Sequence, residues 1–398
     1  MKKVLLLPYL LIGFSYTFLL YNKIFFGVSL VLGILSLFFI QKDNFSLRLK
    51  FSDNKINLFF FLTIFFFLIS SLISIKPERS ILVIIYFVFF IIISLNLFNL
   101  LIKSEDSYKK ILNFFIISTI INILIIFFYN IYESEILIGN LQIYGIKKYK
   151  GILSIISILV LLLFFFKKSK LFLIPLVCLI PSLYLSDSSA PILGFLMGIF
   201  ALIFFKVIAK IKLTKIKVLI LSIIFISIVG SFVKELPNKF DQNSIDNQNF
   251  TIPISLLDAH RQFIWGFSLS KFIEKPFFGF GPDTSNFIEE GQKQIGSKFT
   301  GTMNFIPSHP HNFFIELLLE TGLAGTLSFL IFIIILNYKI MKRANSYQKN
   351  FLIFFNGYFW GASLVNFSYW QAWWQCSYFL ILSFITAHIF HTSSKVLK

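Results

Sequence analysis

The chain has 398 residues, of which 57% are hydrophobic and 14% are charged, and its mean hydropathy is +0.82. A soluble domain carries about 25% charged residues, so a soluble fold would leave much of this Phe, Ile and Leu exposed. The net charge of +18 comes from short lysine clusters between apolar runs, without an aromatic-interleaved basic face, and this argues against a nucleic acid partner.

Twelve apolar segments are candidates for membrane spans, because about 20 residues are needed to cross ~30 Å of hydrocarbon. They lie near 4–21, 24–40, 56–75, 81–101, 111–131, 151–166, 171–186, 190–208, 217–233, 312–337, 351–368 and 372–391. Lysines and arginines gather on the side of the termini, which predicts that both termini are cytoplasmic. We expect an all-α polytopic membrane protein with about 12 transmembrane helices, forming a single domain over residues 1–398.

One connection, residues 234–308, is a long polar loop between the ninth and tenth spans, and we predict that it is periplasmic. Connections of about 2–8 residues are usual in helix bundles, so this length indicates a functional loop. We expect short amphipathic helices in it, the first over 256–273 and another over 286–294, with a sharp turn at 275–282, where Pro and Gly recur. The apolar side of the first would be formed by Phe263, Ile264, Phe267, Leu269 and Ile273.

The segment Ser308-His-Pro-His-Asn312 stands where this loop re-enters an apolar span. Helical spacing then places Asn312, Glu316 and Glu320 on one face. Charged groups within a span are costly, so this face should point into the bundle or a water-filled cavity. From Asn312 to Tyr338 the span is longer than the hydrocarbon, so either its polar first turns protrude outward or the helix bends at Gly322-x-x-Gly325.

Each of these features also has a structural interpretation. His309 and His311 could form a metal pair, but such a site needs a third ligand, and none is evident. The glycine motif is typical of helix packing, and the glutamates could pair with a loop arginine. Arg261, the only arginine in the loop, either contacts lipid headgroups or binds phosphate through two parallel hydrogen bonds.

Three tryptophans, Trp370, Trp373 and Trp374, flank the last external turn. Anchoring at the membrane interface is the ordinary role of such a cluster. Stacking against a sugar is the alternative.

His311-Asn312, followed after nine residues by Gly322-x-x-Gly325-Thr326, resembles the signature of the O-antigen ligase and O-antigen polymerase family. Upstream, Arg261-x-x-x-Trp265 and Pro276-x-x-Gly279-x-Gly281 are similar to that family's loop pattern. These motifs cover about 258–330, and the twelve-span layout with one large external loop extends the resemblance over the chain.

The resemblance implies an enzyme of the bacterial inner membrane. It would transfer or polymerise a glycan from undecaprenyl diphosphate onto an acceptor hydroxyl at the periplasmic face, without metal, nucleotide or other cofactor. The acceptor would be lipid A-core, a growing glycan or a protein. By the same resemblance, His311 would be the general base, Arg261 would hold the diphosphate, and Glu320 would orient one of them. Asn312, His309 and Glu316 are expected to bind substrate.

The sequence departs from the family pattern at one place. Where the family usually has a Ser-Arg pair, this chain reads Ser186-Asp-Ser-Ser-Ala190. A second phosphate-binding cation would then come from Lys147, Lys148 or Lys150 in the 132–150 loop, or the activity is altered. We assign Lys150 to substrate binding.

Two other classes of protein stay open from the sequence. A transporter or flippase of a polar or anionic solute would keep ionisable residues near the membrane midplane, whereas this chain gathers its polar chemistry in one external loop. A catalytically altered scaffold of a polysaccharide-assembly complex would agree with the missing arginine. The sequence alone leaves the acceptor and the donor sugar open.

Overall fold

The computed structural model describes residues 6–41, 45, 51, 53–135, 146–167, 169–210, 215–297, 301–365 and 367–396. The helices before the large loop are α1 (Leu7–Gly13), α2 (Ser15–Tyr21), α3 (Lys23–Gln41), α4 (Asn54–Leu72), α5 (Pro77–Lys103), α6 (Glu105–Glu133), α7 (Lys150–Phe166), η3 (Lys170–Phe172), α8 (Leu173–Leu185), α9 (Ser189–Lys210) and α10 (Lys215–Lys234). After it come α13 (Phe313–Arg343), α14 (Ser346–Ala362) and α15 (Ala372–Val396).

The predicted all-α membrane fold is confirmed in its main feature. Each of the twelve expected spans falls on helix, although the first is divided at Phe14 into α1 and α2. In the described part of the chain, seven helices are long and apolar enough to cross a membrane: α3, α4, α5, α6, α9, α13 and α15. The others include α10, which has 20 residues but is not among these seven, and shorter helices such as α8, which has 13 residues with Pro181 inside. The protein is thus a multi-pass membrane protein, and the number twelve stays a prediction.

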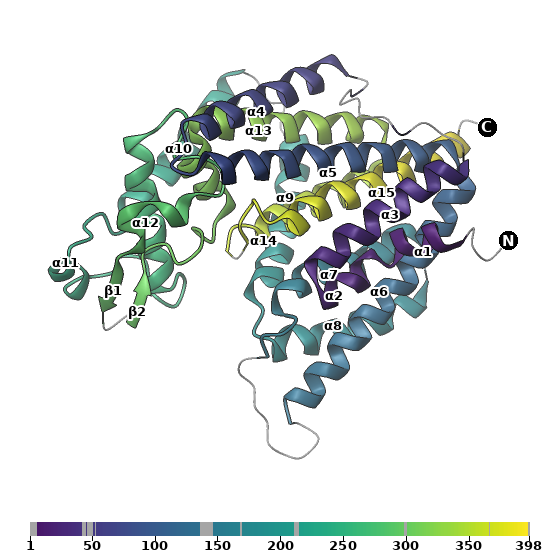
Figure 1. Ribbon diagram of the computed structural model, residues 1–398, viewed down its shortest axis with the longest axis horizontal. Coiled ribbons are helices and arrows are strands. Elements are labelled where there is room, and N and C mark those ends of the chain that lie inside the picture. Colours follow the sequence, from purple (N-terminus) through teal and green to yellow (C-terminus); the bar gives the residue numbers. More distant parts are fainter. Residues whose placement is uncertain are drawn as a thin grey trace.

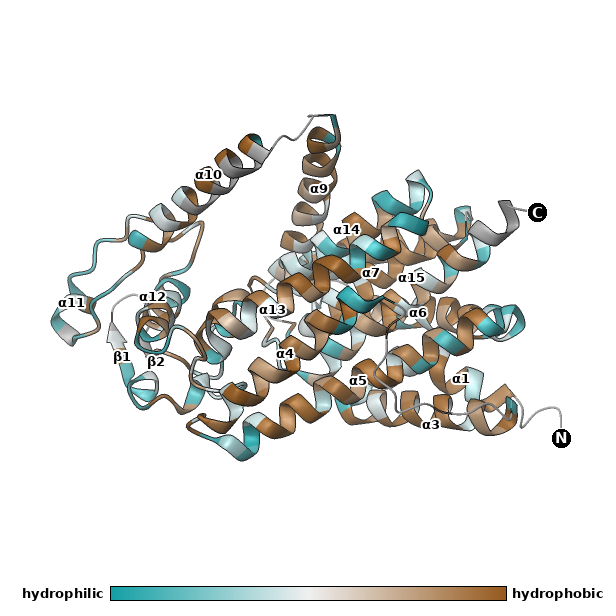
Figure 2. Ribbon diagram, turned by 90° about the horizontal axis from the view of Figure 1, so that it is seen from above, coloured by the Kyte–Doolittle hydropathy of each residue, from teal (hydrophilic) through white to brown (hydrophobic). Residues whose placement is uncertain are grey.

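The long helices pack as neighbours that are distant in sequence. α13 lies against α4, α15 against α5, and α9 against α14. Figure 1 shows the start of α1 and the end of α15 at one end of this bundle, with the loop elements at the other. In Figure 2, apolar residues run along the long helices, and α10 stands apart from the bundle as it leads to the loop.

The large loop has a fold of its own. It contains α11 (Gln242–Asp246), α12 (Ala259–Glu274), the 3₁₀ turns η4 (Ser285–Phe287) and η5 (Glu289–Gln292), and the strands β1 (Gln294–Ser297) and β2 (Gly301–Asn304), which pair antiparallel. A small apolar core holds it together, formed by Ile245, Phe263, Phe267, Phe280, Ile288, Ile295, Phe305, Ile306 and Leu319. Because Leu319 belongs to α13, this core also seats the loop on a long helix of the bundle.

The expected amphipathic helix is found as α12, with its first turn three residues later than predicted at Ala259. Phe263, Ile264 and Phe267 are buried, as expected, whereas Ile273 is 74% exposed because α12 ends one residue later. The prediction of a short helix over 286–294 is wrong. Two 3₁₀ turns and the start of β1 occupy that range, since the strand pairs with residues beyond it.

α13 is broken at Gly322, where the predicted bend occurs with φ of 64°. The break leaves backbone N–H groups of α13 without partners in the helix, and carbonyl groups of the turn at 275–282 accept their hydrogen bonds. Leu323 N–H donates to Pro276 O at 2.8 Å and Ala324 N–H to Phe277 O at 3.2 Å. In return, Gly281 N–H donates to the carbonyl of Glu320 at 2.8 Å. The two glycine-containing motifs of the sequence therefore form one interlocked contact.

We expect Gly322→Ala to destabilise the protein. A side chain at this φ costs about 1–3 kcal/mol, and its Cβ would lie 2.2 Å from the Phe277 carbonyl carbon. The matched control is Gly230→Ala in α10, where a Cβ meets nothing within 4 Å and the helix gains about 0.5–1 kcal/mol. The measurement is the thermal unfolding midpoint of both variants in detergent. A midpoint for Gly322→Ala equal to that of wild type would contradict the prediction.

Candidate active site

The two histidines of the His-Pro-His segment lie side by side at the start of α13. Their ring centroids are 4.1 Å apart, with His309 buried and His311 partly exposed. His309 Nδ1 is 2.9 Å from Ser308 Oγ. His311 has the left-handed φ of 54°, which turns the chain into the helix. Among the described residues no three His, Cys, Asp or Glu side chains are arranged to hold a metal ion.

Asn312 caps α13. Its side-chain oxygen accepts hydrogen bonds from the backbone N–H groups of Phe314 and Ile315 at 3.1 and 3.2 Å, as an N-cap asparagine does. The next backbone N–H, that of Phe313, donates to the carbonyl of Ser363 at 3.0 Å. The cap thus uses the oxygen of the side chain that we expected to bind substrate, and it fixes where His311 emerges.

Arg261 lies in the first turn of α12, next to this segment. Its guanidinium donates to Asp258 Oδ2 at 2.8 Å and to the carbonyl of Val365 at 3.1 Å, and the side chain stays 31% exposed. One turn further along α12, the Trp265 indole N–H donates to the carbonyl of Pro310 at 3.0 Å. One rigid helix thereby holds Arg261 and positions the residue before His311.

Glu316 is buried in the bundle, as the spacing predicted. Its oxygens accept hydrogen bonds from Ser368 Oγ at 2.7 Å and from the backbone N–H of Tyr369 at 2.6 Å. Both donors belong to the connection between α14 and α15, residues 363–371. The geometry supports the structural interpretation of this glutamate, although its partner is a backbone amide and a serine rather than an arginine.

Glu320 is also fully buried and has a richer set of donors. Its carboxylate accepts the backbone N–H groups of Asp283, Thr284 and Ser285 at 2.7, 3.0 and 2.8 Å. The Trp370 indole N–H makes a further hydrogen bond to it. Neither His311 nor Arg261 is among its hydrogen-bond partners, so the expectation that Glu320 orients one of them has no support in this geometry.

The segment that Glu320 holds is tied to the start of α5. Arg79 Nε donates to both the carbonyl and the carboxylate of Asp283, at 2.9 and 2.8 Å, and Ser80 Oγ donates to Pro282 O at 2.8 Å. Burial raises the pKa of the Asp283 carboxyl, and the nearby Arg79 opposes that shift. Nothing in the local sequence of Arg79 points to this contact, because its partner lies 204 residues away.

Lys150 meets the turn where the family's Ser-Arg pair is missing. Its ammonium is 3.6 Å from the carboxylate of Asp187, and Ser188 Oγ donates to the Lys150 carbonyl at 3.2 Å. Lys148 lies instead over the rings of Tyr129 and Tyr149. Of the three lysines considered, Lys150 is thus the one that the fold brings to the 186–190 turn.

The tryptophan cluster is not an interfacial belt. Trp370, Trp373 and Trp374 are at most 5% exposed. Trp374 stacks on Phe359 with centroids 4.3 Å apart and donates to Ser363 Oγ at 2.9 Å. The interpretation as membrane-interface anchors therefore does not hold, because protein atoms enclose these rings.

The 363–371 connection is the point where these parts meet. It accepts hydrogen bonds from Arg261 through Val365 and from the start of α13 through Ser363. It donates to both buried glutamates. A Cβ at Gly151, next to Lys150, would lie 3.6 Å from Phe367 of this connection. Its role could not be predicted from the sequence, where Trp370 is its one conspicuous residue.

Comparisons with known proteins agree with the class that the fold defines, a multi-pass α-helical membrane protein. Residues 174–330 match the model of the O-antigen ligase family. The resemblance read from the motifs is thus confirmed over these residues. The matched range includes Arg261, His311 and Glu320, and leaves out Lys150 and the 363–371 connection.

Three relatives from Rickettsia bear the name "putative polysaccharide ligase". The chain is 30% identical to the Rickettsia conorii protein over 280 residues, which are 68% of this chain and 64% of that protein. The chain is 31% identical to the Rickettsia prowazekii protein over 210 residues, which are 50% of this chain and 47% of that protein. It is 27% identical to the Rickettsia bellii protein over 328 residues, which are 79% of this chain and 76% of that protein. The chain thus spans slightly under two thirds of the first relative and about half of the second.

We expect Glu320→Gln to lower the thermal unfolding midpoint. An amide cannot accept on its nitrogen, so at least one buried donor would lose its partner, at about 1–3 kcal/mol. Glu274→Gln is the matched control. This α12 glutamate is 54% exposed and pairs with Lys271, so the substitution should change the free energy of unfolding by no more than about 0.5 kcal/mol. A Glu320→Gln protein with unchanged stability and no activity would instead establish a catalytic carboxylate.

Proposed function

We propose that this protein transfers a glycan from a lipid-linked diphosphate, undecaprenyl diphosphate in a bacterial inner membrane, to an acceptor hydroxyl at the periplasmic face. The observation that carries this proposal is that the same part of the structure holds Arg261 and His311. Both come from the matched domain, and both are held through the 363–371 connection and Trp265. A general base beside a phosphate-binding guanidinium is the pair that this transfer needs.

The proposed reaction has one bond made and one broken. The acceptor oxygen attacks the anomeric carbon of the glycan while His311 takes the proton of the hydroxyl. The bond from that carbon to the diphosphate oxygen breaks, and the lipid diphosphate leaves. Arg261 would stabilise the charge that develops on the leaving group, with two N–H groups in a fixed plane. The reaction as written requires no metal ion.

The remaining residues take supporting roles in this proposal. Glu316 and Glu320 would hold the scaffold, because their oxygens already accept hydrogen bonds from the protein. Lys150 would supply the second cation near the donor, in place of the family's arginine, with Asp187 setting its position. His309 and Asn312 would border the substrate next to His311.

Transport is the weaker alternative. Its support in the sequence came from the carboxylates at the edge of the span, Glu316 and Glu320. Each of them already accepts hydrogen bonds from donors of the protein itself, whereas a transporter needs such groups to be available to the solute. Ligase, polymerase and protein glycosylation share the proposed chemistry and differ only in the acceptor.

We expect His311→Asn to leave a folded protein that is inactive in glycan transfer. Asparagine tolerates the left-handed φ of this position better than alanine does, so the loss of a proton acceptor is separated from backbone strain. The host gene is deleted and complemented with wild type, His311→Asn or His311→Ala, and surface glycans are separated on a gel. The control is His260→Asn, which removes a loop imidazole bonded to the Asn304 carbonyl. Wild-type glycans with both His311 variants would refute the assignment.

Arg261→Lys should weaken donor binding about tenfold or more, because lysine keeps the charge and loses the planar pair of donors. The measurement is the KM for a lipid-diphosphate-linked glycan with the purified protein. Arg79→Lys is the matched control, since this arginine bonds Asp283 on a different external turn and should affect stability rather than KM. An unchanged KM in Arg261→Lys would remove Arg261 from the donor site.

A further inference from the structure

A groove lies at the end of the bundle opposite the candidate active site. Two adjoining cavities of about 440 and 350 Å³ share Phe164, Leu173 and Tyr347, so they form one continuous depression. It runs between the second half of α7, the start of α8 and the start of α14. Phe165 fixes the position of the groove, because its ring packs against His388 near the end of α15 with ring centroids 5.0 Å apart.

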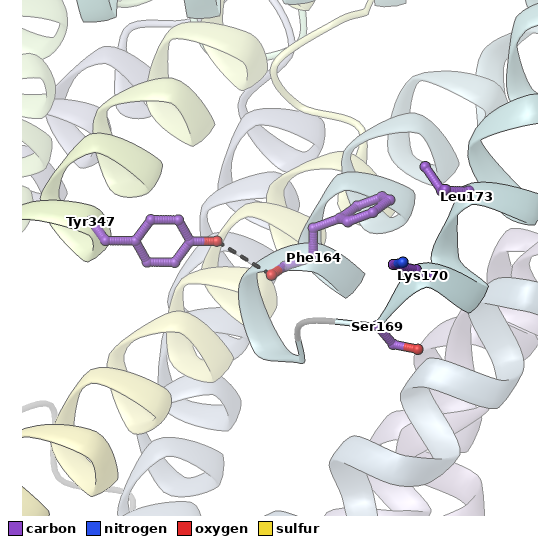
Figure 3. A pocket seen from close by; sticks show the side chains of 5 residues that line it. All are labelled: Phe164, Ser169, Lys170, Leu173 and Tyr347. Atoms are coloured by element: carbon purple, nitrogen blue, oxygen red, sulfur yellow. Dashed lines mark hydrogen bonds between the residues drawn. The ribbon is translucent and has the colours of Figure 1, made fainter.

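The two ends of the groove differ in chemistry. The end towards the middle of the bundle is lined by Leu161, Leu176 and Phe354. The outer end is lined by Ser169 and Lys170, where the chain passes from α7 to η3. Figure 3 shows this outer end, with Lys170 and Ser169 close to Phe164 and Leu173, and Tyr347 across from them. The groove therefore passes from apolar to cationic along the direction in which a lipid lies in a membrane.

The walls of the groove are preformed. Tyr347 donates its hydroxyl to the Phe164 carbonyl at 3.2 Å, a bond that ties α14 to α7. Beneath it, Phe165 stacks on Phe351 with centroids 4.2 Å apart. Phe354 is fixed from the other side, since a Cβ at Gly198 of α9 would lie 2.7 Å from its ring. An occupant would thus meet a shaped apolar surface without an ordering cost for these rings.

The cation at the outer end is available to a ligand. Lys170 is exposed and, among the described residues, has neither an ion-pair nor a hydrogen-bond partner. Its neighbour Lys167, by contrast, donates to Asn113 Oδ1 at 2.8 Å. Basic pockets between transmembrane helices bind anionic lipid headgroups, and a lysine can lay its alkyl chain on apolar surface while its amine reaches the phosphate.

We propose that this groove binds an anionic membrane phospholipid, with an acyl chain along Leu161, Leu176 and Phe354 and the headgroup phosphate on Lys170. The assignment is independent of the proposed glycan transfer, since no residue of the groove takes part in it.

The test is native mass spectrometry of the full chain in detergent, titrated with phosphatidylglycerol or phosphatidylcholine of identical acyl chains. Wild type should prefer phosphatidylglycerol about fivefold, because its headgroup has a net negative charge whereas the choline cation offsets the phosphate of phosphatidylcholine, and one lysine near an anionic headgroup supplies about that factor. Lys170→Glu should abolish that preference, and Lys170→Gln, the milder change, should reduce it. Leu173→Trp, which fills the shared part of the groove, should weaken both lipids by a similar factor.

Lys342→Glu is the matched control, since this exposed lysine near the end of α13 does not line the groove. It should keep the wild-type preference. Equal binding of the two lipids to wild type, or a full preference in Lys170→Gln and Lys170→Glu, would overturn the headgroup site. Unchanged binding of both lipids to a monodisperse Leu173→Trp protein would overturn the groove as the place of binding.

Discussion

The packing of the large loop on the long helices depends on the buried carboxylate of Glu320. A charge in such surroundings is tolerated only when it is well hydrogen-bonded, and three successive backbone amides together with the Trp370 indole meet that requirement. Two residues later, α13 breaks at Gly322 and exchanges backbone hydrogen bonds with the turn at 275–282. The Glu320 side chain binds residues 283–285, and the break at Gly322 binds the turn just before them. Both contacts therefore anchor the same stretch of the loop.

This arrangement explains how a long loop can present side chains with precision. Sites are most accurate when rigid elements carry them. Here α12 is packed on the loop's own core and on α13, and the His311 segment is fixed by Trp265 on one side and by Ser363 on the other. The anchors are mostly backbone groups, which leaves the His311 ring partly exposed and the Arg261 guanidinium one-third exposed.

The two ends of the bundle carry different chemistry for one physical reason. Polar groups within hydrocarbon must be satisfied by the protein, and several hydroxyl groups within the helices bond to their own helix. Thr63, Ser157 and Ser182, for example, bond to backbone carbonyls four residues earlier. Groups able to meet a substrate or a headgroup are therefore confined to the ends, with His311 and Arg261 at one and Lys170 at the other.

Composition and periodicity alone determined the helical membrane fold, the position of the large loop and the inward direction of Glu316 and Glu320, because each follows from the cost of exposing a side chain to the wrong solvent. Short motifs were enough to indicate the family, because His311-Asn312 and the glycines at 279, 281, 322 and 325 form patterns that are local in sequence. What the two glutamates bind was decided only by the tertiary structure. Their donors lie 35 to 53 residues away, and no local pattern encodes such a contact. The same holds for the 363–371 connection and the tryptophans in and after it, which the sequence predicts as lipid anchors and which the packing of α13, α14 and α15 encloses.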